Sequence, residues 1–184
     1  MYKVLFFVFF LFSLASCSLP WTQTESSGST DATFVYSGSG FSIALPTTWT
    51  LAKSSEVPTP HYGILAVAYV SPEVKYGFSS NVIIMKDTLA SPVTSKKYSE
   101  LNNLQTTKNY LEYTKLQDAA ITFTDSDVSQ VYVFEARYNT TTPLMKFIQT
   151  AKVCGTDVYL LHFTLSLDKD ETKYIDLFKT FACK

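Results

Sequence analysis

Three strand-like segments joined by short connections, between residues 130 and 167, constrain the fold of this chain more than any other feature. Apolar and β-branched residues dominate segments 130–138, 144–153 and 158–167. The connections between them, 139–143 and 154–157, are five and four residues long. Because connections this short join neighbouring antiparallel strands, the three segments are predicted to form an antiparallel meander.

Shorter strands are predicted before the meander. Phe41, Ile43 and Leu45 alternate with small or polar residues, so they share one face of a strand. Pro46 ends this strand, and Trp49 after it is expected to pack over the core. Further strands are predicted at 33–37, 64–70, 81–86 and 119–124, with a loop at 54–62 and a loop or hairpin end at 71–78. The runs at 64–70 and 81–86 are continuously apolar, which indicates strands buried on both faces.

Two segments have helical periodicity. The first is predicted to begin at Thr94 or Ser95, either of which is a suitable N-cap, and to end at Glu112. Its expected sheet-facing arc is Tyr98, Leu101, Leu104, Gln105, Lys108 and Leu111. The last helix is predicted to begin at Asp168, with Glu171 completing an acidic capping box. Its expected buried stripe is Tyr174, Leu177, Phe178, Phe181 and Ala182.

The first sixteen residues have the composition of an export signal. Lys3 is followed by an almost unbroken apolar run from Val4 to Leu14. A membrane-spanning helix needs about 20 apolar residues, so this run is too short to be a stable span. Its length is that of the hydrophobic region of a secretory signal peptide.

The end of this leader resembles the lipobox of bacterial lipoproteins, represented here by Leu14, Ala15, Ser16 and Cys17. The resemblance implies transfer of a diacylglyceryl group to the Cys17 sulfur and cleavage after Ser16. The mature chain would then be anchored by lipid on the extracytoplasmic face of a bacterial membrane, inner or outer. An ordinary secretory signal cut near Ala15, with Cys17 as an incidental thiol, is the alternative.

Composition divides the chain after the signal peptide of residues 1–16. Residues 17–32 follow as the lipidated cysteine and a tether rich in Ser and Thr, which would hold the domain roughly 20 Å from the bilayer. Residues 33–184 suit a single folded domain. Beyond the leader, fourteen basic residues stand against sixteen acidic ones, a net charge of −2. No basic stripe is present, so nucleic acid is not an expected partner.

The order of the predicted elements resembles the PsbP and Mog1-like fold that is shared with DcrB-type lipoproteins. The resemblance spans residues 33–184 and rests on the segments GFSIALPTTW, NVIIMK, VYVFEARY, MKFIQTAKVCGTDVYLLHFTL and YIDLFKTFACK. It implies an α+β domain, an antiparallel β-sheet flanked by helices as an α/β/α sandwich, with roles in binding or assembling other proteins. It supplies no catalytic residue.

Two cysteines remain once Cys17 is acylated. Cys154 lies in the last hairpin and Cys183 near the end of the last helix. Because that helix must run back along the last strand, its far end returns to the hairpin tip, and a disulfide is geometrically reasonable. Two buried free thiols, or a terminus too frayed to form the bridge, are the alternatives.

Motifs for catalysis or metal binding are missing from the sequence, and no cofactor is expected. It contains no G-x-S-x-G, H-E-x-x-H, C-x-x-C or phosphate loop. His61 and His162 have no Cys or carboxylate cluster beside them and are interpreted as structural. Asp125 and Asp127 lack the rest of a calcium loop and are interpreted as a solvated turn. Helix capping explains the carboxylates of Asp168, Asp170 and Glu171, and a hairpin turn explains the sequon at Asn139.

Three functions are compatible with this sequence. The preferred hypothesis is a non-catalytic envelope lipoprotein that binds or helps to assemble other proteins at the membrane surface. The second is a small-ligand binder with an aromatic pocket between sheet and helix, suggested by the twelve Tyr and fourteen Phe. The third is a hydrolase with an unrecognised site.

Overall fold

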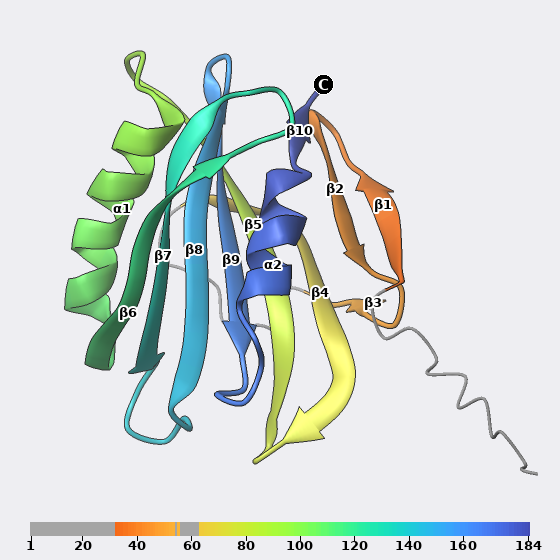
Figure 1. Cartoon of the computed structure of the whole chain (residues 1–184), viewed down its shortest axis with the longest axis vertical. Helices are drawn as coiled ribbons and strands as arrows, with labels where there is room; N and C mark the ends of the chain where they lie inside the picture. The colour runs from red at the N-terminus through yellow and green to blue at the C-terminus, as the bar shows by residue number, and fades with distance from the viewer. Residues whose placement is uncertain (1–31, 54, 56–62) are drawn as a thin grey trace, which may run out of the picture.

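A computed structural model describes residues 32–53, 55 and 63–184. The lipobox, Cys17, most of the tether and His61 lie outside the described residues. Two antiparallel sheets and two helices make up the described part (Figure 1). The elements are β1 (Thr33–Ser37), β2 (Phe41–Pro46), β3 (Thr50–Leu51), β4 (Ile64–Lys75), β5 (Phe78–Thr88), α1 (Ser95–Asn109), β6 (Leu111–Thr122), β7 (Val128–Arg137), β8 (Met145–Cys154), β9 (Asp157–Leu165), α2 (Thr172–Lys179) and β10 (Ala182–Cys183).

The larger sheet has seven strands in the order β3-β4-β5-β9-β8-β7-β6, and the smaller has the order β1-β2-β10. The antiparallel meander β7-β8-β9 is confirmed, with register pairs such as Phe134 with Phe147 and Ile148 with Phe163. β9 pairs in turn with β5, which brings the β4–β5 hairpin into the same sheet. Neither helix of the described residues is long and apolar enough to cross a bilayer.

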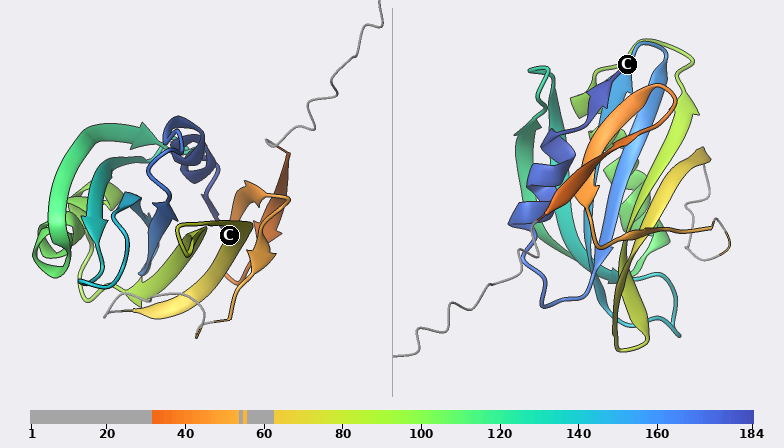
Figure 2. Two further views of the ribbon diagram at one scale, coloured as in Figure 1. Left: turned by 90° about the horizontal axis from the view of Figure 1, so that it is seen from below. Right: turned by 90° about the vertical axis from the view of Figure 1, so that its right-hand side faces the viewer.

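One face of the large sheet carries the main hydrophobic core. α2 and the small sheet cover this face together, as Figure 2 shows. The Phe163 ring lies 4.7 Å from that of Phe178 in α2, and Phe41 of the small sheet stacks on Phe181 at 5.0 Å. Trp49 is buried against Phe163, as expected. The covering of this face therefore combines a helix with a second sheet.

Helix α1 covers the opposite face, but with a different side from the one predicted. Its N-cap is Thr94, as expected, and its buried residues are Ser95, Ser99, Asn102 and Thr106. Leu101 and Leu104, which were predicted to face the sheet, are 48% and 58% exposed. The reason is polar pairing, because Ser99 Oγ donates to the Gln130 carbonyl and Thr106 Oγ1 donates to Gln149 Oε1. Small hydroxyl side chains let the helix approach a sheet that offers hydrogen-bond acceptors.

Two predicted boundaries are wrong because strands are longer than the apolar pattern indicates. Of the two alternatives for 71–78, the hairpin end is correct, but β4 continues beyond residue 70 to Lys75, and a tight turn at Tyr76 and Gly77 leads directly into β5. The first helix ends at Asn109, and β6 begins at Leu111 rather than at residue 119. β6 is an edge strand with mostly exposed side chains, so it has no apolar periodicity to reveal it.

The last helix is shorter than predicted. α2 begins at Thr172, and Asp168 is not its cap. Asp168 forms an ion pair with Lys75, while Glu171 accepts from Lys146 at 2.8 Å, so both carboxylates are engaged with the sheet. The predicted buried stripe is confirmed at its centre, since Tyr174 and Phe178 are the buried residues of the helix.

The disulfide between Cys154 and Cys183 is present, with a Cα–Cα distance of 5.6 Å. Cys154 ends β8 and Cys183 lies in β10, which pairs with β2. The bridge therefore ties the small sheet to the β8–β9 turn of the large sheet.

Candidate binding site at one end of the large sheet

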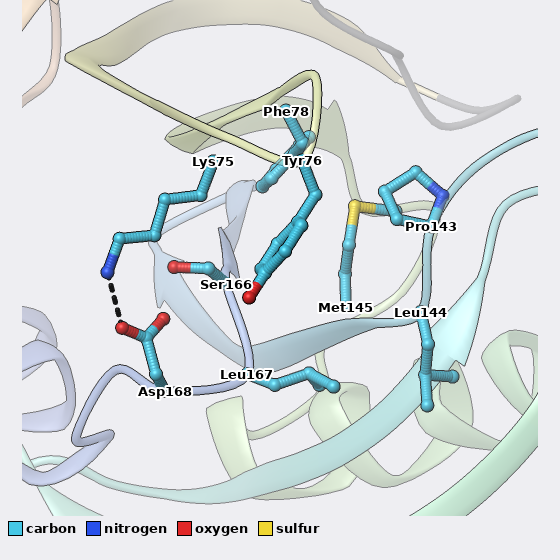
Figure 3. Close-up of a pocket in the computed structure, with 9 residues that line it drawn as sticks. All are labelled: Lys75, Tyr76, Phe78, Pro143, Leu144, Met145, Ser166, Leu167 and Asp168. Carbon is cyan, nitrogen blue, oxygen red and sulfur yellow. Dashed lines mark hydrogen bonds and ion pairs between the residues drawn. The ribbon is translucent and has the colours of Figure 1, made fainter.

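Three connections converge at one end of the seven-stranded sheet. They are the β4–β5 turn, the loop between β7 and β8, and the segment that leads from β9 to α2. A cavity of about 500 Å³ opens between them (Figure 3). Its lining residues are Lys75, Tyr76, Phe78, Pro143, Leu144, Met145, Ser166, Leu167 and Asp168. We call it the first cavity.

The rim of the first cavity exposes apolar side chains. Tyr76 is 91% exposed, and in Figure 3 its side chain reaches across the opening toward Ser166 and Leu167. Tyr76 takes a positive φ of 53° in the β4–β5 turn, an uncommon conformation for a bulky residue. Leu167, on the opposite side, is also exposed. Tyr76 and Leu167 together present apolar surface to solvent at the opening of the first cavity, as binding grooves do.

The charged groups of the first cavity are paired with one another. Lys75 Nζ contacts the carboxylate of Asp168, as the dashed line in Figure 3 shows, and also lies 3.3 Å from Glu73 Oε1. The hydrogen bond from Lys75 lowers the pKa of Asp168 to about 2, and the same bond raises the pKa of Lys75. Both groups are therefore charged at neutral pH and hold the β4–β5 hairpin to the segment that follows β9.

A second cavity, of about 590 Å³, lies next to the first, and the two share part of their lining. Phe78, Pro143 and Met145 form this shared part, because they line both cavities. The other residues that line the second cavity are Thr50, Leu51, Ala52, Val70, Gly77, Ser79, Asn81, Tyr138, Thr141 and Thr142. None of these side chains carries a charge.

The loop between β7 and β8, which borders both cavities, is held by Asn139. Asn139 Oδ1 accepts hydrogen bonds from the backbone N–H groups of Thr141, at 2.9 Å, and Thr142, at 3.1 Å. Arg137 Nη1 donates to the carbonyl of Thr142 at 2.7 Å. The interpretation of Asn139 as a turn residue is confirmed, and these bonds fix the loop that carries Pro143.

His162 and the carboxylates of Asp125 and Asp127 line neither cavity, whereas Asp168 lines the first. His162 is buried in β9 against Phe147, and burial lowers its pKa to about 4. Asp125 and Asp127 lie at an exposed turn, as interpreted, but the sequence did not reveal that both carboxylates also bind the buried Lys152 Nζ, at 2.7 and 2.9 Å. Among the residues that the structure describes, no group of three or more His, Cys, Asp or Glu is arranged to hold a metal.

The sequence pattern alone does not reveal the residues that line the two cavities. The sequence predicts Tyr76 and Phe78 only as part of a loop or hairpin end, and Pro143 and Met145 only as part of a hairpin connection and of a strand face. One sequence feature could have indicated this site, namely Tyr76-Gly77 between two strand-like runs. A large aromatic residue at a turn lies away from the hydrophobic core, so its side chain is expected at the surface.

Comparison with known proteins identifies the fold. No known protein family matches the sequence, and no curated protein matches it either. The solution structure of cyanobacterial PsbP (CyanoP) from Synechocystis sp. PCC 6803 is similar to this chain, with a TM-score of 0.57 and 9% sequence identity. The similarity covers 84% of this chain and 94% of CyanoP. A protein of unknown function from Pseudomonas aeruginosa has a TM-score of 0.48 and 9% identity, over 73% of this chain and 83% of its own. The domain therefore has a PsbP-like α+β fold.

Proposed function

We propose that this chain is a non-catalytic DcrB-type lipoprotein, anchored through Cys17 on the extracytoplasmic face of a bacterial membrane, that binds or helps to assemble other proteins. The observation that carries the binding role is the first cavity with its exposed apolar rim. Tyr76 and Leu167 flank an opening that is large enough for one or two apolar side chains. Aromatic residues exposed beside a cavity are the usual anchors of protein interfaces.

Two observations support the proposed localisation. The leader ends in Leu14, Ala15, Ser16 and Cys17, which resemble a lipobox. The disulfide of Cys154 and Cys183 favours an oxidising compartment outside the cytoplasm, where such bridges persist. The similarity to CyanoP concerns the fold alone, so it supports neither the proposed localisation nor the proposed protein partner.

The proposed membrane localisation is tested by replacing Cys17, the residue proposed to carry the lipid. With Cys17→Ala, we expect the exported protein to leave the membrane fraction. Without the Cys17 sulfur the chain cannot receive the diacylglyceryl group, and it lacks the two acyl chains that stable anchoring requires. Ser18→Ala is the matched control and should stay with membranes. Retention of both variants in the membrane fraction would contradict the lipid anchor.

The partner surface is tested by site-specific crosslinking in cells. A photoreactive benzoylphenylalanine at position 76 should form a discrete adduct, because this side chain stands on the rim of the first cavity. The same group at position 104, an exposed residue of α1 that lines neither the first nor the second cavity, is the control and should form no such adduct. Adducts that are equal at both positions, or missing at position 76, would contradict binding at this end of the sheet.

A further inference from the structure

The second cavity contains a buried polar group whose hydrogen-bonding capacity is incompletely used. Asn81 lies in β5 and is only 2% exposed. Its Nδ2 donates to the carbonyl of Ser79 at 3.2 Å. Its Oδ1 accepts no hydrogen bond from any residue that the structure describes. A buried amide oxygen without a donor is unfavourable and uncommon in folded proteins, so it calls for an explanation.

The strand register directs Asn81 toward the second cavity. Ser79 and Asn81 line it, whereas Ser80 and Val82 between and after them do not. Val82 packs in the main hydrophobic core, and Ser80 Oγ accepts from the backbone N–H of Ser166. Because alternate residues of a strand face opposite sides, the Asn81 amide lies on the cavity side of β5.

The neighbours of Asn81 on this face already have partners. Asn81 is in register with Thr164 of β9, and the hydroxyl of Thr164 lies 3.2 Å from Tyr138 Oη. Tyr138 and Thr164 share one hydrogen bond, in which either hydroxyl can donate, and neither hydroxyl forms a hydrogen bond to Asn81 Oδ1. No described residue donates to Asn81 Oδ1, which leaves this oxygen able to accept from a bound molecule.

The rest of the lining restricts the chemistry of such a donor. Leu51, Val70, Phe78 and Met145 supply apolar surface, and the polar contributions are hydroxyl and amide groups. The lining has no charged side chain, so an ionised ligand would lose its hydration without a counter-ion. The volume of about 590 Å³ lies within the range of pockets that hold small organic molecules.

We infer that the second cavity is a binding site for a small uncharged molecule with an apolar body and one N–H or O–H group, which donates its hydrogen bond to Asn81 Oδ1. The apolar body occupies the space beside Phe78, Met145 and Val70. This inference goes beyond the proposed function and does not depend on the lipid anchor or on a protein partner.

Three related probes test this site by calorimetry on the purified full chain, with the buffer and detergent alone as blanks. Indole has an apolar body and one N–H donor, 1-methylindole lacks the donor, and indole-3-acetate carries a negative charge. We expect indole to bind about two- to tenfold more tightly than 1-methylindole, the factor expected for one hydrogen bond. Indole-3-acetate should bind more weakly than both. No binding of indole, equal binding of indole and 1-methylindole, or preference for indole-3-acetate would overturn the inference.

Two asparagine variants identify the acceptor. Asn81→Leu removes the amide at similar size, so it should abolish the preference for indole over 1-methylindole while the domain stays folded. Asn102→Leu is the matched control, because Asn102 is also a buried asparagine with an unpaired amide atom but does not line the second cavity. Loss of the preference in both variants, or in neither, would overturn the role of Asn81. If Asn81→Leu does not fold, the comparison of the three probes on the unmodified chain still decides the question.

Discussion

Acid should destabilise this domain through a buried histidine, in addition to its effect on the paired carboxylates. His162 is 1% exposed in β9, and its ring centroid lies 5.4 Å from that of Phe147 and 6.4 Å from that of Tyr110. Neither ring nitrogen has a hydrogen-bond partner among the described residues. Burial in this aromatic setting disfavours the imidazolium and lowers the pKa of His162 from 6.5 to about 4.

The sign and the size of the effect follow from proton linkage. In the unfolded chain His162 takes up a proton as the pH falls through about 6.5, whereas in the folded chain it stays neutral until about pH 4. The unfolded state is therefore favoured progressively between these two values, and no further loss occurs below the lower one. A lowering of the pKa by this amount corresponds to about 3 kcal/mol of unfolding free energy.

Urea unfolding of the full chain between pH 7.5 and pH 4 measures this effect. His162→Phe keeps an aromatic ring against Phe147 and removes the titrating group, so its free energy of unfolding should decline less. The other titrating groups, His61 included, are present in both proteins and cancel in the difference. The difference should change by about 3 kcal/mol across this range. Parallel stability curves for the two proteins would refute the reasoning.

Two further predictions concern the links between elements. Asp125→Asn with Asp127→Asn leaves the buried cation of Lys152 unpaired and should cost about 3–5 kcal/mol in urea unfolding, and adding Lys152→Met should recover most of it. Because the pKa values of both carboxyls are lowered in the folded protein, their contribution to stability is present above the ordinary pKa of Asp and is lost as the pH falls through the lowered values. A free energy of unfolding that stayed constant in this acid range would argue against the ion pairs. Cys154→Ser with Cys183→Ser opens a loop of 29 residues and should lower the free energy of unfolding by about 3.6 kcal/mol. A thiol reductant should bring the unmodified protein to the same urea midpoint, and no shift in either case would contradict the bridge.

The parts of the fold that follow from the sequence are those in which one face of an element is buried in apolar surroundings. The meander is an example, because β9 is almost entirely buried and short turns leave no other pairing for it. The stripe of α2 is another, with Tyr174 and Phe178 buried on the main core. In both cases hydrophobic periodicity and burial coincide, which is the condition under which pattern reasoning works.

Helix α1 shows why the same reasoning fails where burial is polar. Periodicity placed Leu101 and Leu104 against the sheet, yet Ser99 and Thr106 occupy that side. The free energy of this interface comes from hydrogen bonds to β7 and β8 and from close approach, neither of which leaves an apolar signature in one segment. The acceptors belong to strands that lie more than 30 residues further along the chain, so the correct side is decided by partners that the helix sequence does not contain.

The second cavity adds a further reason why a site can escape detection in the sequence. Asn81 opens the run 81–86, where a polar residue at the start of a strand is unremarkable. Its significance depends on a register that pairs it with Thr164, and on Tyr138, which pairs with the hydroxyl of Thr164. Asn81 becomes a buried acceptor without a donor only when β5 and β9 are in register and Tyr138, which follows β7, pairs with Thr164. The site is thus a property of strand pairing, and a change that shifted this register by one residue would turn Asn81 toward the main core and remove the site.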